Sequence, residues 1–141
     1  MILADVNVLL YAFRQDADRH PEYRRWLEDV VNADAAYGVS PQVLASVIRI
    51  STHRFIYVHP SSLAESLAFC EALIEPSNCT IVQPGPRHWD IFNGLCRKAR
   101  ASGNLVQDAW FAALAVESGC EWITTDRDYA RFPGLRWREP L

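Results

Sequence analysis

Lysine is nearly absent from the sequence: of its 14 basic residues, only Lys98 is a lysine. Any mechanism that needs a catalytic lysine therefore has a single candidate. An excess of positive charge is also lacking, because 17 acidic residues outweigh the basic ones and the net charge is −3. This balance excludes a protein that binds nucleic acid by bulk charge alone, but it allows binding through a local groove or a bound cation.

The sequence has few cysteines and no long apolar run. Its four cysteines form no CxxC pair and do not lie at zinc-like spacing from a histidine, so a structural zinc site is not expected. We expect reduced thiols in a cytoplasmic protein. The sequence has no signal-peptide pattern and no run of about 18 apolar residues that could span a membrane, so no membrane partner is expected.

Half of the 141 residues are apolar, which is enough for the core of one domain spanning residues 1–141. Short apolar runs alternate with segments of helical period. The predicted strands are residues 2–6, 35–39, 80–82, 121–125 and 135–138, and the predicted helices are residues 9–14, 21–31, 41–50, 62–74, 88–101 and 107–117. This alternation predicts an α/β fold with a central, mostly parallel sheet flanked by helices.

Three aspartates are predicted at the carboxyl edge of this sheet, where α/β proteins bind their ligands. Asp5 ends the first strand, Asp126 follows the strand at residues 121–125, and Asp108 lies in the first turn of the last helix. Helix capping is an alternative role for Asp108 and Asp126. Asp5 is harder to explain in this way, since a charge at the end of a buried strand costs several kcal/mol unless it is paired or bound to a metal.

Taken together, the three carboxylates predict a site for a hard cation. Carboxylates at one sheet edge repel one another, and oxygen ligands without histidine or cysteine favour Mg²⁺ or Mn²⁺ over zinc. Such an ion supports phosphodiester hydrolysis, because it lowers the pKa of an attacking water and neutralises charge on the phosphate. It would also allow an acidic protein to hold a polyanion.

Four segments of the chain resemble, in order, the motifs of PIN-domain nucleases, in particular the VapC toxins of bacterial toxin–antitoxin pairs. The first is LADVNVLLYA at residues 3–12 and the second is SPQVLASVIR at residues 40–49. The third consists of Asp108-Ala109 with the alanine-rich stretch at residues 112–115, and the fourth is TTDRDYARFP at residues 124–133. The likeness covers almost the whole chain.

The resemblance implies a PIN-like three-layer fold and a metal-dependent endoribonuclease that acts on RNA. It further implies a homodimer that is inhibited by a VapB-type antitoxin, whose helix we expect to bind in a hydrophobic groove. Carried over by position, Asp5, Asp108 and Asp126 match the metal-binding acids of the family. Asn7 and Thr124 match polar positions that support them.

Two positions leave open which residues bind the metal. Asp128 either joins the metal cluster or caps the following helix. Ser46 stands where the family commonly has a glutamate, so three acids rather than four would hold the ion. This departure leaves a one-metal site, a second metal recruited with substrate phosphate, or an impaired enzyme. Arg49, on the same predicted helix, is expected either to bind substrate phosphate or to form an ion pair with one of the acids.

Two other functions compete with the ribonuclease. A haloacid-dehalogenase-like phosphatase would use Asp5 as its nucleophile. Such an enzyme usually has a general acid two residues later, and here Asn7 occupies that position. The third hypothesis is a PIN-fold binding module that has lost its chemistry because of Ser46.

Overall fold

Five short parallel strands form the centre of the protein in the computed structural model, which describes residues 1–141. Their order in the sheet is β3-β2-β1-β4-β5. The strands are β1 (Ile2–Ala4), β2 (Tyr37–Val39), β3 (Cys79–Ile81), β4 (Glu121–Ile123) and β5 (Trp137–Arg138). Every pairing is parallel. The predicted α/β class with a mostly parallel sheet is thus confirmed.

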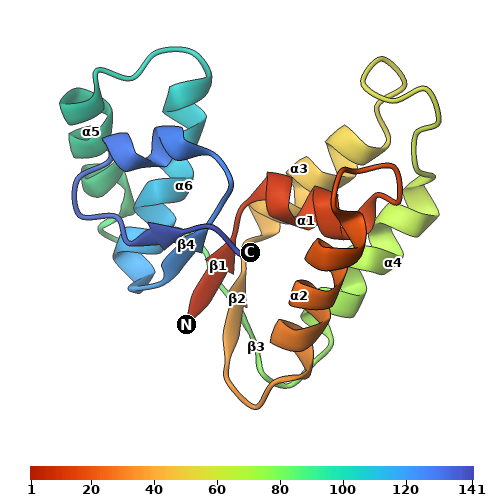
Figure 1. The fold of residues 1–141 in the computed structure, drawn as a ribbon. Helices are drawn as coiled ribbons and strands as arrows, with labels where there is room; N and C mark the ends of the chain where they lie inside the picture. Colours follow the sequence, from red (N-terminus) through yellow and green to blue (C-terminus); the bar gives the residue numbers. More distant parts are fainter.

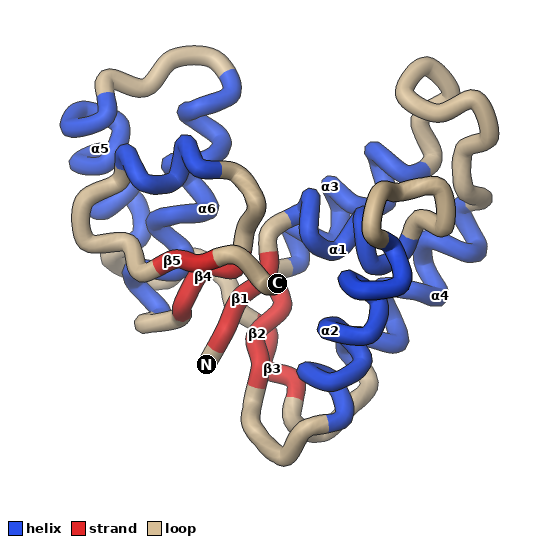
Figure 2. The backbone as a smooth tube through the Cα atoms, viewed as in Figure 1, coloured by secondary structure: helices blue, strands red, loops and turns tan.

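Two groups of helices cover the sheet and give the molecule the shape of a V (Figure 1). The right-hand limb in this view contains α1 (Val6–Phe13), α2 (His20–Asn32), α3 (Pro41–Ser51) and α4 (Leu63–Ile74). The left-hand limb contains α5 (His88–Ala99), α6 (Asn104–Ser118) and the 3₁₀ helix η1 (Arg127–Arg131). Figure 2 shows the strands at the junction of the two limbs. The layers are therefore helix, sheet and helix.

The core is built where the helices meet the sheet. Leu3 of β1 and Trp122 of β4 are fully buried, as are the alanines of the inner face of α6. Alanine side chains allow α6 to pack closely against the neighbouring elements, and Gly119, in the left-handed conformation, ends the helix and leads the chain into β4. The first turns of α6 therefore lie near the carboxyl end of β4.

Several element boundaries differ from the sequence prediction. The first strand ends at Ala4 rather than residue 6, because Asp5 caps α1, which begins at Val6. The helix predicted at residues 88–101 ends earlier, because Arg100 in the left-handed conformation caps α5, and Gly103 stands at the start of α6. Since α6 begins at Asn104, Asp108 lies in its second turn and not in its first.

No helix in the structure combines the length and the apolar character that a membrane crossing requires.

Two glycines provide a matched test of the packing. A Cβ at Gly38 would lie 2.9 Å from a methyl carbon of Val82 and 3.3 Å from the carbonyl oxygen of Ile2, whereas a Cβ at Gly94 would meet nothing within 4 Å. We expect Gly38→Ala to lower the free energy of unfolding by about 1–3 kcal/mol through overpacking. Gly94→Ala, inside α5, should raise it by about 0.5–1 kcal/mol. Urea denaturation measures both changes, and equal effects of the two substitutions would contradict this account of the packing.

Candidate active site

The strand order brings Asp5 close to the end of β4. β1 and β4 are adjacent and parallel, and Ala4 pairs with Ile123, so their carboxyl ends lie at one edge of the sheet. The amide of Asp5 extends this pairing by donating to the carbonyl oxygen of Ile123 at 2.9 Å. In the sheet, β2 lies on one side of β1 and β4 lies on the other, so the direction in which strands are added reverses at β1. This reversal is the place where open α/β sheets bind their ligands.

The Asp5 carboxylate is buried without a positively charged partner; the residue is only 6% exposed. Its Oδ1 accepts a hydrogen bond from the Val6 amide at 2.7 Å, and its Oδ2 accepts one from the Thr124 hydroxyl at 2.7 Å. Burial raises the pKa of Asp5 to about 6 against the lowering effect of these two bonds, and the charges of Asp108 and Asp126 raise it further.

Thr124 connects Asp5 with the segment that carries Asp126. Its fully buried hydroxyl donates to Asp5 and accepts a hydrogen bond from the Asp126 amide at 3.0 Å. Because a hydroxyl has one proton to donate, this arrangement fixes the direction of both bonds. The Asp126 Oδ1 in turn accepts from the Asp128 amide at 2.9 Å and caps η1. Asp126 thus has the capping role that the sequence allowed, and it still lies close enough to repel Asp5.

Asp108 reaches the same place from α6. It is partly buried, and it does not cap the helix. The hydroxyl of Tyr129 donates to its Oδ1 at 3.4 Å. Burial raises the pKa of Asp108 to about 6; the charges of Asp126 and Asp128 raise it too, and the Tyr129 hydrogen bond lowers it. The charge of Asp126 raises the pKa of both Asp5 and Asp108, and the charge of Asp108 raises the pKa of Asp5, so the three acids interact electrostatically.

These residues fit a divalent cation, although no three of the acids already stand together as a ready-made ligand group. Mutual repulsion keeps charged carboxylates apart unless a cation lies between them. Two features favour such an ion: the buried Asp5 carboxylate has no cationic partner, and the Oδ1 of Asn7 is buried without any hydrogen-bond partner. Oxygen donors of this kind are typical ligands of Mg²⁺ and Mn²⁺.

The remaining predicted residues differ in how far they are exposed to solvent. Ser46 is partly buried on α3, and Arg49 is exposed one turn further along that helix and forms no ion pair. The ion pair considered for Arg49 is therefore not formed. Asp128 is exposed in the first turn of η1 and raises the pKa of Asp108 by its charge, while Asp126 accepts the capping hydrogen bond.

Tyr129 is a residue of the site that the sequence did not predict. This residue is almost completely buried, it packs against Trp122 and Phe132, and its hydroxyl faces the acids. Burial and the negative charges of Asp5 and the other acids raise its pKa, so it stays protonated and remains a donor. The only signal in the sequence was an amphipathic aromatic residue directly after Asp128, which equally indicates an ordinary core residue.

Comparison with known proteins identifies the class to which this fold and site belong. The family model for the PIN domain matches residues 2–135. The chain therefore belongs to the PIN-domain family.

Full-length relatives narrow this assignment. Ribonuclease VapC43 of Mycobacterium tuberculosis is 40% identical over 141 residues, covering 100% of this chain and 96% of the relative. Ribonuclease VapC25 of the same species is 41% identical over 140 residues, covering 99% of both. Within the PIN-domain family the chain is thus one of the VapC ribonucleases, as its four motifs indicated.

Solved structures with low sequence identity share the fold. A chain in the crystal structure of VapBC2 from Rickettsia felis, bound to a DNA fragment from its promoter, has a TM-score of 0.70 and 18% identity, with 99% of this chain and 98% of that chain covered. VapC20 of M. tuberculosis, described as a toxin that cleaves the sarcin–ricin loop, has a TM-score of 0.65 and 15% identity, with 96% of this chain and 99% of that chain covered. The PIN-like arrangement of layers is therefore confirmed.

Metal-free protein should become less stable as the pH rises from 3.8, the ordinary aspartate pKa, to about 6, the pKa of Asp5 in the fold. Below this range the carboxyl is protonated in both folded and unfolded chains and has no effect. Within it the unfolded chain releases the proton while the folded chain retains it, so folding becomes less favourable by about 3 kcal/mol above pH 6. Denaturation of wild type and Asp5→Asn in chelator, from pH 4 to 7.5, measures the difference. Parallel profiles of the two proteins would contradict the burial of an unpaired charge.

Proposed function

We propose that this protein is an endoribonuclease that depends on Mg²⁺ or Mn²⁺ and acts as the toxin of a toxin–antitoxin pair, with Asp5, Asp108 and Asp126 as its metal-binding and catalytic residues. The observation that carries the proposal is the buried Asp5 carboxylate, which faces two further acids and has no cationic partner. When bound, the ion would activate a water and neutralise charge on the scissile phosphate. The ribonuclease names of the relatives agree with this chemistry.

Residues beside the acids hold them in a state ready for the cation. The Thr124 hydroxyl orients one oxygen of Asp5 and the Val6 amide orients the other. The Tyr129 hydroxyl donates to Asp108 and remains protonated, so it stabilises the charged carboxylate at any pH at which RNA is intact. The carbonyl oxygen of Asn7 is buried and has no hydrogen-bond partner in the protein. Such partners of metal ligands fix their orientation.

Ser46 makes the site less acidic than one with four carboxylates. A hydroxyl supplies no negative charge, so we propose that the site works with weaker metal binding. Arg49 lies one turn along α3, is exposed and has no acidic partner. Its guanidinium is therefore free to form charge-assisted hydrogen bonds with a phosphate of the substrate.

The two alternatives are distinguished by chemistry. The phosphatase is not favoured, because its general acid would be Asn7, which has no acidic proton, and the family assignment points to nucleases. A binding module without activity would keep the fold and the partner but would cleave no RNA under any condition.

RNA cleavage by the purified, partner-free protein should require Mn²⁺ or Mg²⁺ and should stop in chelator. Asp5→Asn and Asp108→Asn should each lower the rate by at least about 100-fold, since loss of even the partners of metal ligands costs about 10–100-fold. Asp34→Asn, at an exposed acid in the loop before β2, is the matched control and should cleave normally. Gel assays on structured RNAs measure the rates, with melting curves to check folding. Cleavage that survives in chelator would contradict the metal site.

The missing acid can be restored. Ser46→Glu should lower the Mn²⁺ concentration that gives half-maximal cleavage, because a further carboxylate at the edge of the site increases the attraction for the cation. Titration of Mn²⁺ into wild type and variant compares the two values. An unchanged midpoint would mean that position 46 does not face the metal.

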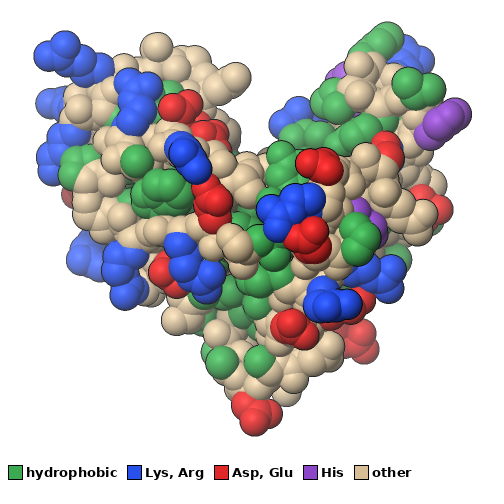
Figure 3. All heavy atoms as spheres, viewed as in Figure 1, with side chains coloured by type: hydrophobic (Ala, Val, Ile, Leu, Met, Phe, Trp, Pro, Cys, Tyr) green, Lys and Arg blue, Asp and Glu red, His purple; other side chains and the backbone are tan.

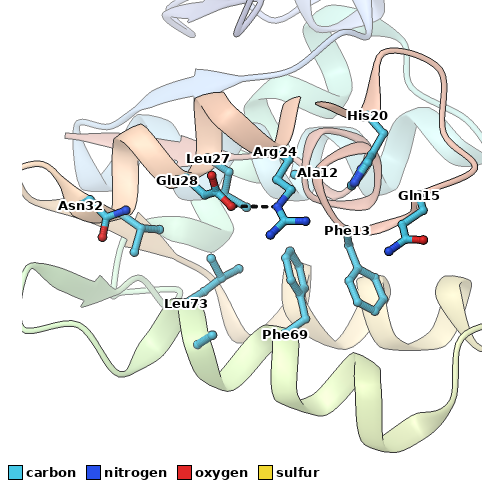
Figure 4. Close-up of a pocket in the computed structure, with 12 residues that line it drawn as sticks. Ala12, Phe13, Gln15, His20, Arg24, Leu27, Glu28, Asn32, Phe69 and Leu73 are labelled. Atoms are coloured by element: carbon cyan, nitrogen blue, oxygen red, sulfur yellow. Dashed lines mark hydrogen bonds and ion pairs between the residues drawn. The ribbon is translucent and has the colours of Figure 1, made fainter. Parts of the chain in front are cut away.

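A groove between α1, α2 and α4 is the candidate site for the antitoxin. It has a volume of about 390 Å³, and seven of its twelve lining residues are hydrophobic. Figure 4 shows Phe13 and Phe69 side by side at its wall, and their rings stack at 4.6 Å. Arg24, paired with Glu28, reaches from α2 toward Phe69 (Figure 4). An amphipathic helix with a few apolar anchors matches such a groove.

We propose a VapB-type protein as the occupant of this groove, because several similar structures are toxin–antitoxin complexes. We also propose a homodimer, which the family resemblance implies. A cytoplasmic location agrees with an RNA substrate and with four cysteines that remain free thiols.

Ala72→Arg should abolish capture of the antitoxin without lowering RNA cleavage, because a long charged side chain would fill the groove that Ala72 lines. Ala68→Arg, also exposed on α4 but outside the groove, is the matched control. Co-expression with a candidate VapB-type antitoxin, followed by co-purification, measures capture. Loss of capture in both variants, or in neither, would place the antitoxin elsewhere.

A further inference from the structure

The loop between α3 and α4, residues 52–62, exposes more apolar surface than any chemistry assigned so far explains. Phe55 is 80% exposed, Val58 is 91% exposed and Ile56 is 52% exposed. Single exposed apolar residues are common, but three within four positions, one of them an aromatic ring, mark a surface that contacts something else.

This loop is anchored. The buried guanidinium of Arg14 donates to the carbonyl oxygen of His59 and to the hydroxyl of Ser61, both at 3.0 Å. It also lies 3.8 Å from the centre of the Tyr57 ring. The amide of Ser61 donates to the carbonyl oxygen of Ser51 at 2.8 Å and closes the base of the loop. The loop therefore presents its tip in a fixed shape, which lowers the entropic cost of binding.

At the tip, the Phe55 ring lies close to His53 and Arg54. The amide of Phe55 donates to His53 Nδ1 at 3.1 Å, and the two rings lie 5.8 Å apart. The guanidinium of Arg54 lies 4.8 Å from the centre of the Phe55 ring. An exposed aromatic ring beside a cation is an arrangement that binds unstacked bases, because the ring stacks on the base and the cation attracts the phosphate.

The charged side chains in and before this loop, at residues 35–64, are all basic. Residues 35–64 contain no aspartate or glutamate, although the chain as a whole has a net charge of −3, and they carry Arg49, Arg54, His53 and His59. The acids that flank the loop are engaged: Asp16 pairs with Arg14, and Glu65 belongs to the capping box of α4. The surface is thus complementary to a polyanion and not to a basic protein.

α3 connects this loop with the acids. The helix begins just after β2, at the carboxyl edge of the sheet, and its 11 residues extend it by about 16 Å. Ser46 and Arg49 lie along this helix, and the loop follows its last residue. The loop forms the end of the right-hand limb, across the hollow from the left-hand limb (Figures 1 and 3). A strand bound at the acids and following α3 would reach the loop.

We propose that the loop at residues 52–62 is an RNA-binding platform in which Phe55 stacks on an unpaired base while Arg49 and Arg54 contact neighbouring phosphates. The platform selects single-stranded or looped RNA, since bases within a duplex cannot reach the ring. This inference rests on the proposed ribonuclease function, to which it adds a substrate preference and a specificity-determining residue.

Fluorescence anisotropy with a labelled, mixed-sequence single-stranded RNA, in chelator to prevent cleavage, tests the platform. Phe55→Ala should weaken binding by about 5- to 150-fold, the usual effect of losing a stacked base. Phe55→Trp should retain binding, because it keeps a ring. Val58→Ala, which removes an even more exposed apolar side chain from the same loop, should bind as wild type. Binding of a fully paired RNA should not respond to Phe55→Ala.

Other outcomes would overturn the platform. Unchanged binding by Phe55→Ala, or equal losses in Phe55→Ala and Val58→Ala, would exclude base stacking. A change in sedimentation without a change in RNA binding would make the loop a contact between copies of the chain. The test also separates the two proposals. If wild type and Phe55→Ala cleave and bind RNA equally well, only the platform is overturned. Phe55-dependent binding without cleavage in Mn²⁺ overturns only the ribonuclease.

Discussion

The burial of one carboxylate shapes this structure. Asp5 ends the central strand, and its environment supplies a hydroxyl and an amide but no cation. The hydrogen bonds do not compensate for the loss of water, because its pKa rises to about 6 in spite of them. The metal-free fold therefore retains an unfavourable interaction that the proposed divalent ion would relieve. In this respect the proposed site differs from an ordinary buried ion pair, in which the partner already belongs to the chain.

The parallel sheet could be predicted because its signals are local. Apolar runs alternate with helical segments, and Asp5 interrupts the first of them at a position where a charge is costly unless it is paired or bound to a metal. The start of α6 could not be predicted in the same way. Gly103 has a positive φ, which suits the end of one helix as well as the start of the next. In the structure Arg100 adopts the left-handed conformation that ends α5, which leaves Gly103 at the start of α6.

The contacts within the site could not be predicted from the sequence for a different reason. Thr124 and Asp5 are 119 positions apart. The Thr124 hydroxyl donates to Asp5 while its oxygen accepts a hydrogen bond from the Asp126 amide. Tyr129 resembles a core aromatic in sequence, and only tertiary packing aims its hydroxyl at Asp108. The motifs thus indicated which segments meet, whereas the polarity of each hydrogen bond depends on the packing around it.

The serine at position 46 has two opposite electrostatic consequences. A fourth carboxylate would attract a cation more strongly. In the metal-free protein, however, it would add to the repulsion among the acids, which already contributes to the raised pKa values of Asp5 and Asp108. The acids needed to hold a cation also repel the phosphates of RNA. The chain separates these charges, with its acids at the sheet edge and only basic charges in residues 35–64. Because α3 begins at that edge and leads away from it, RNA held along this helix would approach the acids from the side on which the protein itself is positive.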